Sequence, residues 1–168
     1  FNYLLIQNSA TLTLGALTNI TVNSSGGLTL SSSAASNINL ANRTFTLSGG
    51  GNLSLSSGAR AITSSPAGGI FAVTTADVTV TNPGTLSFSS DVTVQLAKGM
   101  NFAASGISTI NGTLEIVSGG FVSANPPTYA AGSTLKYNSG GNYTAGSEWT
   151  SNLASGVGVP HHVQVASG

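Results

Sequence analysis

The sequence contains no cysteine and very few charged residues. Without cysteine the chain can form neither a disulfide framework nor a thiolate metal site, so packing and backbone hydrogen bonds must hold it together. Charged residues make up 5% of the 168 residues, against roughly 25% in a typical soluble domain, and four basic residues balance four acidic ones. The basic residues are scattered, at Arg43, Arg60, Lys98 and Lys136. Because phosphate binding needs clustered cations, we expect no nucleic-acid partner and no attachment to an anionic membrane surface.

Long apolar runs and helix signals are also missing. No apolar run approaches the ~20 residues that a membrane-spanning helix needs, so we expect no direct insertion into a membrane. No long segment combines a helical apolar period with capping residues, which argues against helices. The opening stretch, FNYLLIQN, does not begin with Met and lacks the basic region and cleavage site of a signal peptide. We therefore expect a processed protein or a piece of a longer one.

Short alternating phrases fill the chain instead. Each phrase has an apolar, a polar and an apolar residue, and stretches of Ser, Gly, Asn or Pro place neighbouring phrases about eight residues apart. Examples are LTL at 28–30, FTL at 45–47, LSL at 53–55 and VTV at 78–80. Alternation with a period of two predicts β-strands, and the residues between the phrases are turn formers.

A longer period appears when every third phrase is compared. Three apolar columns keep a spacing of 24 or 25 residues: Ile20, Phe45, Ile70 and Val94; Leu28, Leu53, Val78 and Phe102; Ile38, Ile62, Leu86 and Ile110. The short spacing alone would also suit an antiparallel sandwich, but the shared longer period favours a solenoid. We therefore predict an all-β fold, a parallel β-helix (β-solenoid) with three short strands per coil of about 24–25 residues.

The middle residue of each phrase is expected to point outward. This places Thr29, Ser54 and Thr79 in one outward column, and it puts Phe71 on the outside of the neighbouring face. A regular row of hydroxyl groups is the feature that an ice-binding solenoid would use. An ice-binding β-solenoid with this Thr/Ser face is therefore one alternative function.

The rhythm changes after about residue 104. We predict regular solenoid coils over residues 1–104, and an irregular continuation, a cap or a connection to a next module over residues 105–168. In the second part the phrases first come closer together and then spread out around Pro126 and Pro127.

Three aromatic residues, Tyr137, Tyr143 and Trp149, are concentrated in this tail. Terminal repeats must hide the apolar cross-section of a solenoid, so covering the end is favoured over ligand stacking as the role of Trp149. Aromatic side chains also offer large, rigid contact areas. If the module binds a glycan or a cell-surface protein, we expect the contact at these three residues.

The tail also carries a family resemblance. The stretches STLKYNSGGNYTAGSEW at 133–149 and GVGVPHHVQV at 156–165 are similar to a segment that recurs in very long secreted surface proteins of Bacteroidetes. Those proteins have Gly/Ser/Thr-rich β-helical stretches, commonly leave the cell by type IX secretion, and serve as adhesins or other cell-surface proteins. The resemblance implies an extracellular location at a bacterial cell surface, and further repeats of the same long chain as partners.

Candidate catalytic residues are few. The acids are Asp77, Asp91, Glu115 and Glu148, and the predicted register does not bring them together, whereas a glycosidase needs two carboxylates about 5–10 Å apart. Lys98 lies near Asp77 in this register, and we expect a surface ion pair between them. No GxSxG elbow occurs that would activate a serine. We expect no catalytic residue and no cofactor.

The two histidines, His161 and His162, are adjacent in the sequence. Adjacent side chains of an extended segment project to opposite sides, so we expect no metal site there. The sequence as a whole predicts a non-enzymatic extracellular structural or adhesive module, either a stalk or an adhesin segment. A carbohydrate-acting β-helix enzyme is the second alternative, after ice binding.

Overall fold

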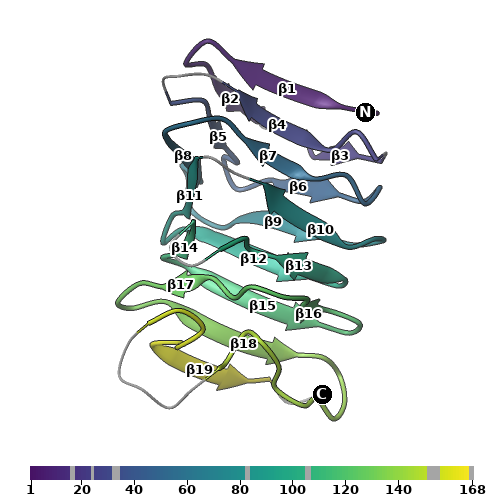
Figure 1. Ribbon diagram of the computed structural model, residues 1–168, viewed down its shortest axis with the longest axis vertical. Helices are drawn as coiled ribbons and strands as arrows, with labels where there is room; N and C mark the ends of the chain where they lie inside the picture. The colour runs from purple at the N-terminus through teal and green to yellow at the C-terminus, as the bar shows by residue number, and fades with distance from the viewer. Residues whose placement is uncertain are drawn as a thin grey trace.

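A computed structural model describes residues 1–15, 18–23, 25–31, 35–81, 84–104, 107–150 and 156–166 of the chain. Figure 1 shows them wound into a stack of about six coils, with the first and last strands at opposite ends. All neighbouring strands in the sheets pair in parallel, as in the Leu4–Leu28 and Ile20–Phe45 pairs. The predicted parallel β-solenoid with three sheets is confirmed.

Each sheet takes one strand from nearly every coil. The first sheet contains β1 (Leu4–Gln7), β4 (Leu28–Ser31), β7 (Leu53–Leu55), β10 (Val78–Thr81), β13 (Gly99–Asn101) and β16 (Phe121–Val122). The second contains β2 (Thr11–Thr13), β5 (Asn37–Asn39), β8 (Ala59–Thr63), β11 (Thr85–Phe88), β14 (Ser108–Ile110) and β17 (Thr128–Tyr129). The third contains β3 (Ile20–Val22), β6 (Thr44–Leu47), β9 (Gly69–Val73), β12 (Val92–Leu96), β15 (Thr113–Val117), β18 (Thr134–Asn138) and β19 (His162–Val165).

Alternation along the strands sends apolar side chains into one core that runs along the stack. One inward column of the third sheet, called the Val73 column below, leads to the candidate site. Its members, each paired with the next, are Val22, Leu47, Val73, Leu96, Ile116, Tyr137 and Val165. All of these except Val165 are buried.

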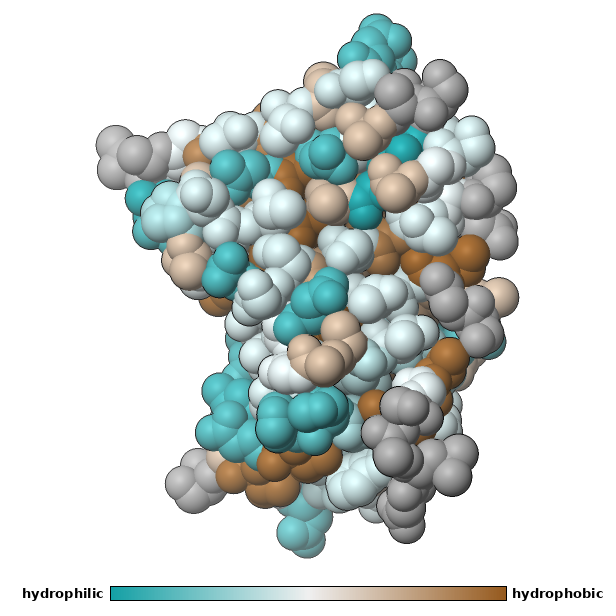
Figure 2. Space-filling view, turned by 90° about the vertical axis from the view of Figure 1, so that its left-hand side faces the viewer, coloured by the Kyte–Doolittle hydropathy of each residue, from teal (hydrophilic) through white to brown (hydrophobic). Residues whose placement is uncertain are grey.

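The sides of the stack are polar without being strongly charged. Figure 2 shows one side, on which residues of intermediate hydropathy predominate. Among the described residues, no large apolar side chain between residues 6 and 120 is exposed; the exposed ones are Phe1, Tyr3, Leu5, Phe121, Trp149, Val163 and Val165. No helix suited to crossing a membrane occurs in the described ranges.

One predicted column is wrong at its third position. Phe45 pairs with Phe71, not with Ile70, and the two phenyl rings stack with centroids 5.8 Å apart. Phe71 is fully buried, and Ile70 lies on the outer face. The interval from Phe45 is therefore one residue longer than expected, and a shift of one residue exchanges the two faces of a strand. The corner before β9 is the cause, because Ile62 and Phe71 are nine residues apart whereas Ile38 and Phe45 are seven apart.

The other two columns are confirmed for their first pairs, Leu28–Leu53 and Ile38–Ile62, and are displaced by two residues beyond them, which keeps each side chain on its predicted face. Leu53 pairs with Val80 instead of Val78, and Val78 pairs with Met100 instead of Phe102. In the second sheet, Ile62 pairs with Phe88 rather than with Leu86. The displaced residues remain buried, so the core composition holds while the vertical partners differ.

The coils change length along the stack. In the third sheet the paired residues Val94 and Leu114 are 20 apart, Leu114 and Leu135 are 21 apart, and Leu135 and Val163 are 28 apart. The sheets nevertheless continue past residue 104, through β14 to β19. The division of the chain at residue 104 stays a prediction.

Candidate functional site

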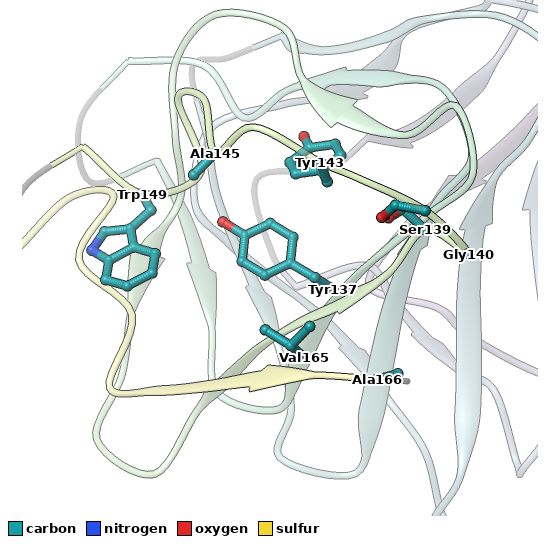
Figure 3. Close-up of a pocket in the computed structure, with 9 residues that line it drawn as sticks. Tyr137, Ser139, Gly140, Tyr143, Ala145, Trp149, Val165 and Ala166 are labelled. Atoms are coloured by element: carbon teal, nitrogen blue, oxygen red, sulfur yellow. The ribbon is translucent and has the colours of Figure 1, made fainter. Parts of the chain in front are cut away.

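A hollow of about 450 Å³ lies beside the last two strands of the third sheet (Figure 3). Its walls come from β18, from β19 and the residue after it, and from the joining segment, by which we mean the described residues 139–150 and 156–161 between the two strands. The lining residues are Tyr137, Ser139, Gly140, Gly141, Tyr143, Ala145, Trp149, Val165 and Ala166. The structure thus brings together the three aromatic residues that the sequence singled out; that they contact a ligand stays a prediction.

The three aromatic side chains reach the hollow in different ways. Tyr137 is the last buried member of the Val73 column, with its ring among the other lining side chains in Figure 3. Tyr143 belongs to the joining segment and packs against the core, with its ring centroid 5.2 Å from that of Tyr137. Trp149 lies across from Tyr143 and is 38% exposed. The hollow therefore combines a buried floor with one accessible indole.

The joining segment is held against the end of the second sheet. Its Gly158 amide donates to the Pro127 carbonyl (2.9 Å), and the Thr150 amide donates to the Gly158 carbonyl (2.8 Å). Thr128 of β17 also forms an antiparallel bridge with Val157. The Gly158–Pro127 bond and the Val157 bridge lie at the free edge of β17. That the tail covers the end of the stack stays a prediction.

Glu148 anchors the same segment through hydrogen bonds. Its side chain is fully buried; its Oε1 atom accepts hydrogen bonds from the Gly146 amide (2.8 Å) and the Tyr137 hydroxyl (3.2 Å). The Tyr129 hydroxyl donates to its backbone carbonyl (3.0 Å). The Oε2 atom has no hydrogen-bond partner, and no basic side chain of the described residues lies within ion-pair distance of the carboxylate.

The buried carboxylate changes the acidity of its neighbours. Burial, followed by the charge of Glu148, raises the pKa of the Tyr143 hydroxyl to about 12 and that of Tyr137 further still. Tyr129 is affected in the same direction, and burial again has the largest effect on its pKa. All three hydroxyl groups are therefore protonated around neutral pH and can act as hydrogen-bond donors.

The remaining acids described by the structure lie elsewhere. Asp77 Oδ1 accepts a hydrogen bond from the Gly99 amide (2.8 Å), and the ion pair expected between Asp77 and Lys98 is not found in the described ranges. The backbone amide takes the place of the ammonium because β13 begins beside Asp77. Glu115 lies on the outer face of β15 and pairs with Lys136 (2.8 Å). Asp91 is exposed at the turn before β12.

The hydroxyl column of the sequence analysis is not a straight row. Thr29 pairs with Ser54, but Ser54 pairs with Thr81, and Thr79 pairs with Asn101. The displacement of β10 by two residues along its neighbour is the reason. A threonine row does run along the outer face of the third sheet, through Thr93, Thr113 and Thr134. It could not be predicted because it depends on the shortened coils.

The geometry expected for the two histidines is wrong. His161 precedes β19 at a bend, so its ring turns toward that of His162, with His161 Nδ1 3.1 Å from His162 Nε2. Two nitrogens alone make an incomplete metal site. No group of three or more possible metal-ligating side chains occurs among the described residues.

Glu148 is the residue of this site that sequence reasoning left without a role. Its place depends on how the joining segment folds back onto Tyr129 and Tyr137, and no periodicity signals that. A comparison of the chain with protein-family models, curated proteins and solved structures finds no match in any of the three.

Proposed function

We propose that this chain is a non-enzymatic structural and adhesive module of a bacterial cell-surface protein. In this function the stacked coils act as a spacer, and the hollow at the last coils makes the contact. The observation that carries the proposal is the gathering of Tyr137, Tyr143 and Trp149 at one hollow near the end of the stack, whereas no described residue between 6 and 120 is an exposed large apolar one.

The architecture supports the spacer part of the proposal. About six coils, stacked at ~4.8 Å each, separate the first strand from the last by roughly 30 Å. Each coil contacts its neighbours through continuous parallel ladders and a shared core. Such a stack keeps the two ends of the module at a fixed distance without needing disulfides.

The placement of the acids supports a non-catalytic function. Asp77 and Glu115 have structural partners, and Glu148 is buried and accepts a hydrogen bond from the Tyr137 hydroxyl. A glycosidase would hold two carboxylates on either side of a substrate. None of the described residues that line the hollow carries a carboxylate, so the hollow does not have that geometry.

The tail resemblance supports the proposed location. The stretches at 133–149 and 156–165, which resemble secreted surface proteins of Bacteroidetes, form β18, the joining segment and β19. In this proposal the chain is exported and displayed outside the cell, where its partners are glycans or surface proteins.

Binding to a glycan array and to intact cells tests the proposal. We expect Trp149→Ala and Tyr143→Ala each to weaken binding by about tenfold, because a stacked aromatic contact contributes about 0.5–1.5 kcal/mol beyond its buried area. Thr29→Ala and Thr79→Ala, on the side of the stack, are the matched controls and should bind as the wild type does.

Unfolding curves must first show that each variant is folded. Full binding by both aromatic variants, with loss in the threonine variants, would move the contact to the side of the stack. Ice-growth inhibition by the wild type that is lost in the threonine variants would instead support the ice-binding alternative.

A further inference from the structure

We propose that the hollow binds an organic cation, with a quaternary ammonium group seated against Tyr137, Tyr143 and Trp149. This inference rests on the proposed function of the hollow as the contact site, and it names the chemical class of the ligand.

The first step is the buried carboxyl group of Glu148, which has no basic partner among the described residues. A carboxyl group this deeply buried is stable as a carboxylate only beside a positive charge. A cation in the adjoining hollow would supply that charge.

The second step is the unused oxygen. The hydrogen bonds from Gly146 and Tyr137 account for Oε1, and the bond from Tyr129 accounts for the backbone carbonyl. These contacts explain Glu148 as an anchor of the joining segment. They leave Oε2 buried and without a hydrogen-bond donor. A quaternary ammonium group has no N–H to donate either, so a cation in the hollow would act on this carboxyl group through its charge alone.

The third step is the chemistry of the wall. Tyrosine and tryptophan rings carry a negative face that attracts cations, and quaternary ammonium groups are recognised in this way. Here two tyrosines and the single tryptophan of the chain share one hollow, and no described lysine, arginine or histidine lines it. Glu148 accepts a hydrogen bond from the Tyr137 hydroxyl and is not a lining residue, so as a carboxylate it would add to the attraction through the tyrosine and not by direct contact.

The size of the hollow fits this class of ligand. A volume of about 450 Å³ is ample for a trimethylammonium group and part of the molecule that carries it. Ser139 and the glycines beside it give the rim a polar edge that could meet a hydroxyl or an ester group of the ligand.

Trp149 fluorescence provides the test, since the chain has one tryptophan. The folded chain is titrated with choline chloride, with potassium chloride, and with the uncharged carbon analogue of choline, in which a tert-butyl group replaces the trimethylammonium group. We expect choline to bind about tenfold or more tightly than the carbon analogue, and potassium chloride to give no saturable change. Equal affinities for choline and its carbon analogue would overturn the inference.

Glu148→Gln tests the origin of that preference, because the amide keeps the size of the side chain and an oxygen acceptor for Gly146 and Tyr137. We expect this variant to lose most of the preference for choline. Glu115→Gln, an acid-to-amide change on the outer face of β15, should keep it. An unchanged preference in folded Glu148→Gln would contradict the role of the carboxylate. If that variant does not fold, the comparison of choline with its carbon analogue on the wild-type protein decides the proposal.

Two further arms separate related outcomes. Binding to phosphatidylcholine vesicles as well as to choline would identify a lipid headgroup as the source of the cation, whereas binding to choline alone would identify a small molecule. Glycan binding that depends on Trp149 without any preference for choline would retain the proposed function and reject this inference.

Discussion

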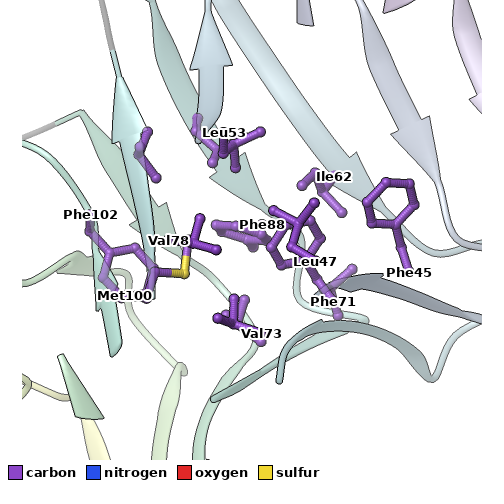
Figure 4. Close-up of a cluster of buried hydrophobic side chains, with 14 of the residues drawn as sticks. Phe45, Leu47, Leu53, Ile62, Phe71, Val73, Val78, Phe88, Met100 and Phe102 are labelled. Carbon is purple, nitrogen blue, oxygen red and sulfur yellow. The ribbon is translucent and has the colours of Figure 1, made fainter. Parts of the chain in front are cut away.

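Val73 and Val165 belong to the same inward column but differ in burial: Val73 is fully buried and Val165 is 75% exposed. Figure 4 shows Val73 among the packed side chains of the core. An aspartate at position 73 would place a carboxylate without a partner between Leu47 and Leu96. We expect Val73→Asp to lower the free energy of unfolding by more than about 4 kcal/mol, or to prevent folding.

Val165→Asp is the matched control for that change, and we expect an effect below about 0.5 kcal/mol. Urea unfolding followed by circular dichroism measures both variants. Similar losses in the two would contradict the register of the third sheet.

Glu115 makes a contribution to stability that depends on pH. Burial raises the pKa of its carboxyl group, but hydrogen bonds from Lys136, Gln95 and Asn138 together lower it below the ordinary 4.5. A group with a depressed folded-state pKa stabilises the fold above its unfolded-state pKa, and the effect disappears as the pH falls through the folded-state value. We expect Glu115→Gln to lower the free energy of unfolding by less than about 1 kcal/mol at neutral pH.

Urea unfolding of wild type and Glu115→Gln across a pH series measures this contribution. The difference between the two proteins should shrink as the pH drops below 4.5. A difference that grows on acidification would show that the ion pair with Lys136 is not its source.

The sequence predicted which residue types form the core better than it predicted individual orientations. The sequence placed Phe71 on the outer face. The face on which a strand residue lies depends on whether the number of residues in the preceding corner is odd or even, and the sequence pattern did not give that number. Arg60 was taken as one of several scattered cations, yet it is buried and donates to the carbonyls of Leu30, Ser57 and Ala59. Its long side chain reaches backbone acceptors that appear only when the coil closes.

At the scale of elements, the corners fix how closely successive coils approach. Gly27 has a φ of +66° before β4, and a Cβ atom there would collide with the backbone of Gly51 and Asn52 in the next coil. Gly132 has a φ of +82°, but a Cβ atom there would meet nothing within 4 Å. Substitutions at Gly132 and Gly27 therefore distinguish the cost of a left-handed backbone from the cost of a clash between neighbouring coils.

We expect Gly132→Ala to cost about 1–2 kcal/mol of stability, from the left-handed backbone alone. Gly27→Ala should cost at least about 2 kcal/mol more, because the neighbouring backbone must move. Thermal and urea unfolding compare the two variants. Equal losses of stability in the two variants would mean that the coils approach each other less closely at Gly27 than the structure shows.

Strand positions and the first vertical pairs, Ile20–Phe45, Leu28–Leu53 and Ile38–Ile62, were predictable, but the register of the later coils was not. The alternating phrases identify strands because side-chain alternation is local, so the LTL, LSL and VTV phrases lie within β4, β7 and β10. Pairing depends on corner lengths, which vary, and no local pattern encodes them. The aromatic residues of the hollow were predictable from their concentration in the tail, whereas Glu148 needed the folded path of the joining segment.

At the scale of the whole molecule, the stack separates two kinds of surface. Its sides carry hydroxyl and amide groups, whose hydrogen bonds water can equally supply, so they offer little affinity. The hollow offers three aromatic rings in one place. This contrast is why the contact is proposed at the last coils and the spacer role for the remainder.

Hydrogen–deuterium exchange with and without a ligand from the glycan array tests this account most directly, because it locates the contact without changing the protein. We predict that the ligand slows exchange in β18, the joining segment and β19, with the largest effect around Tyr143 and Trp149. Exchange in the strands of the first coils should not change. Slower exchange along β4, β7 and β10 instead, with none at the hollow, would contradict it.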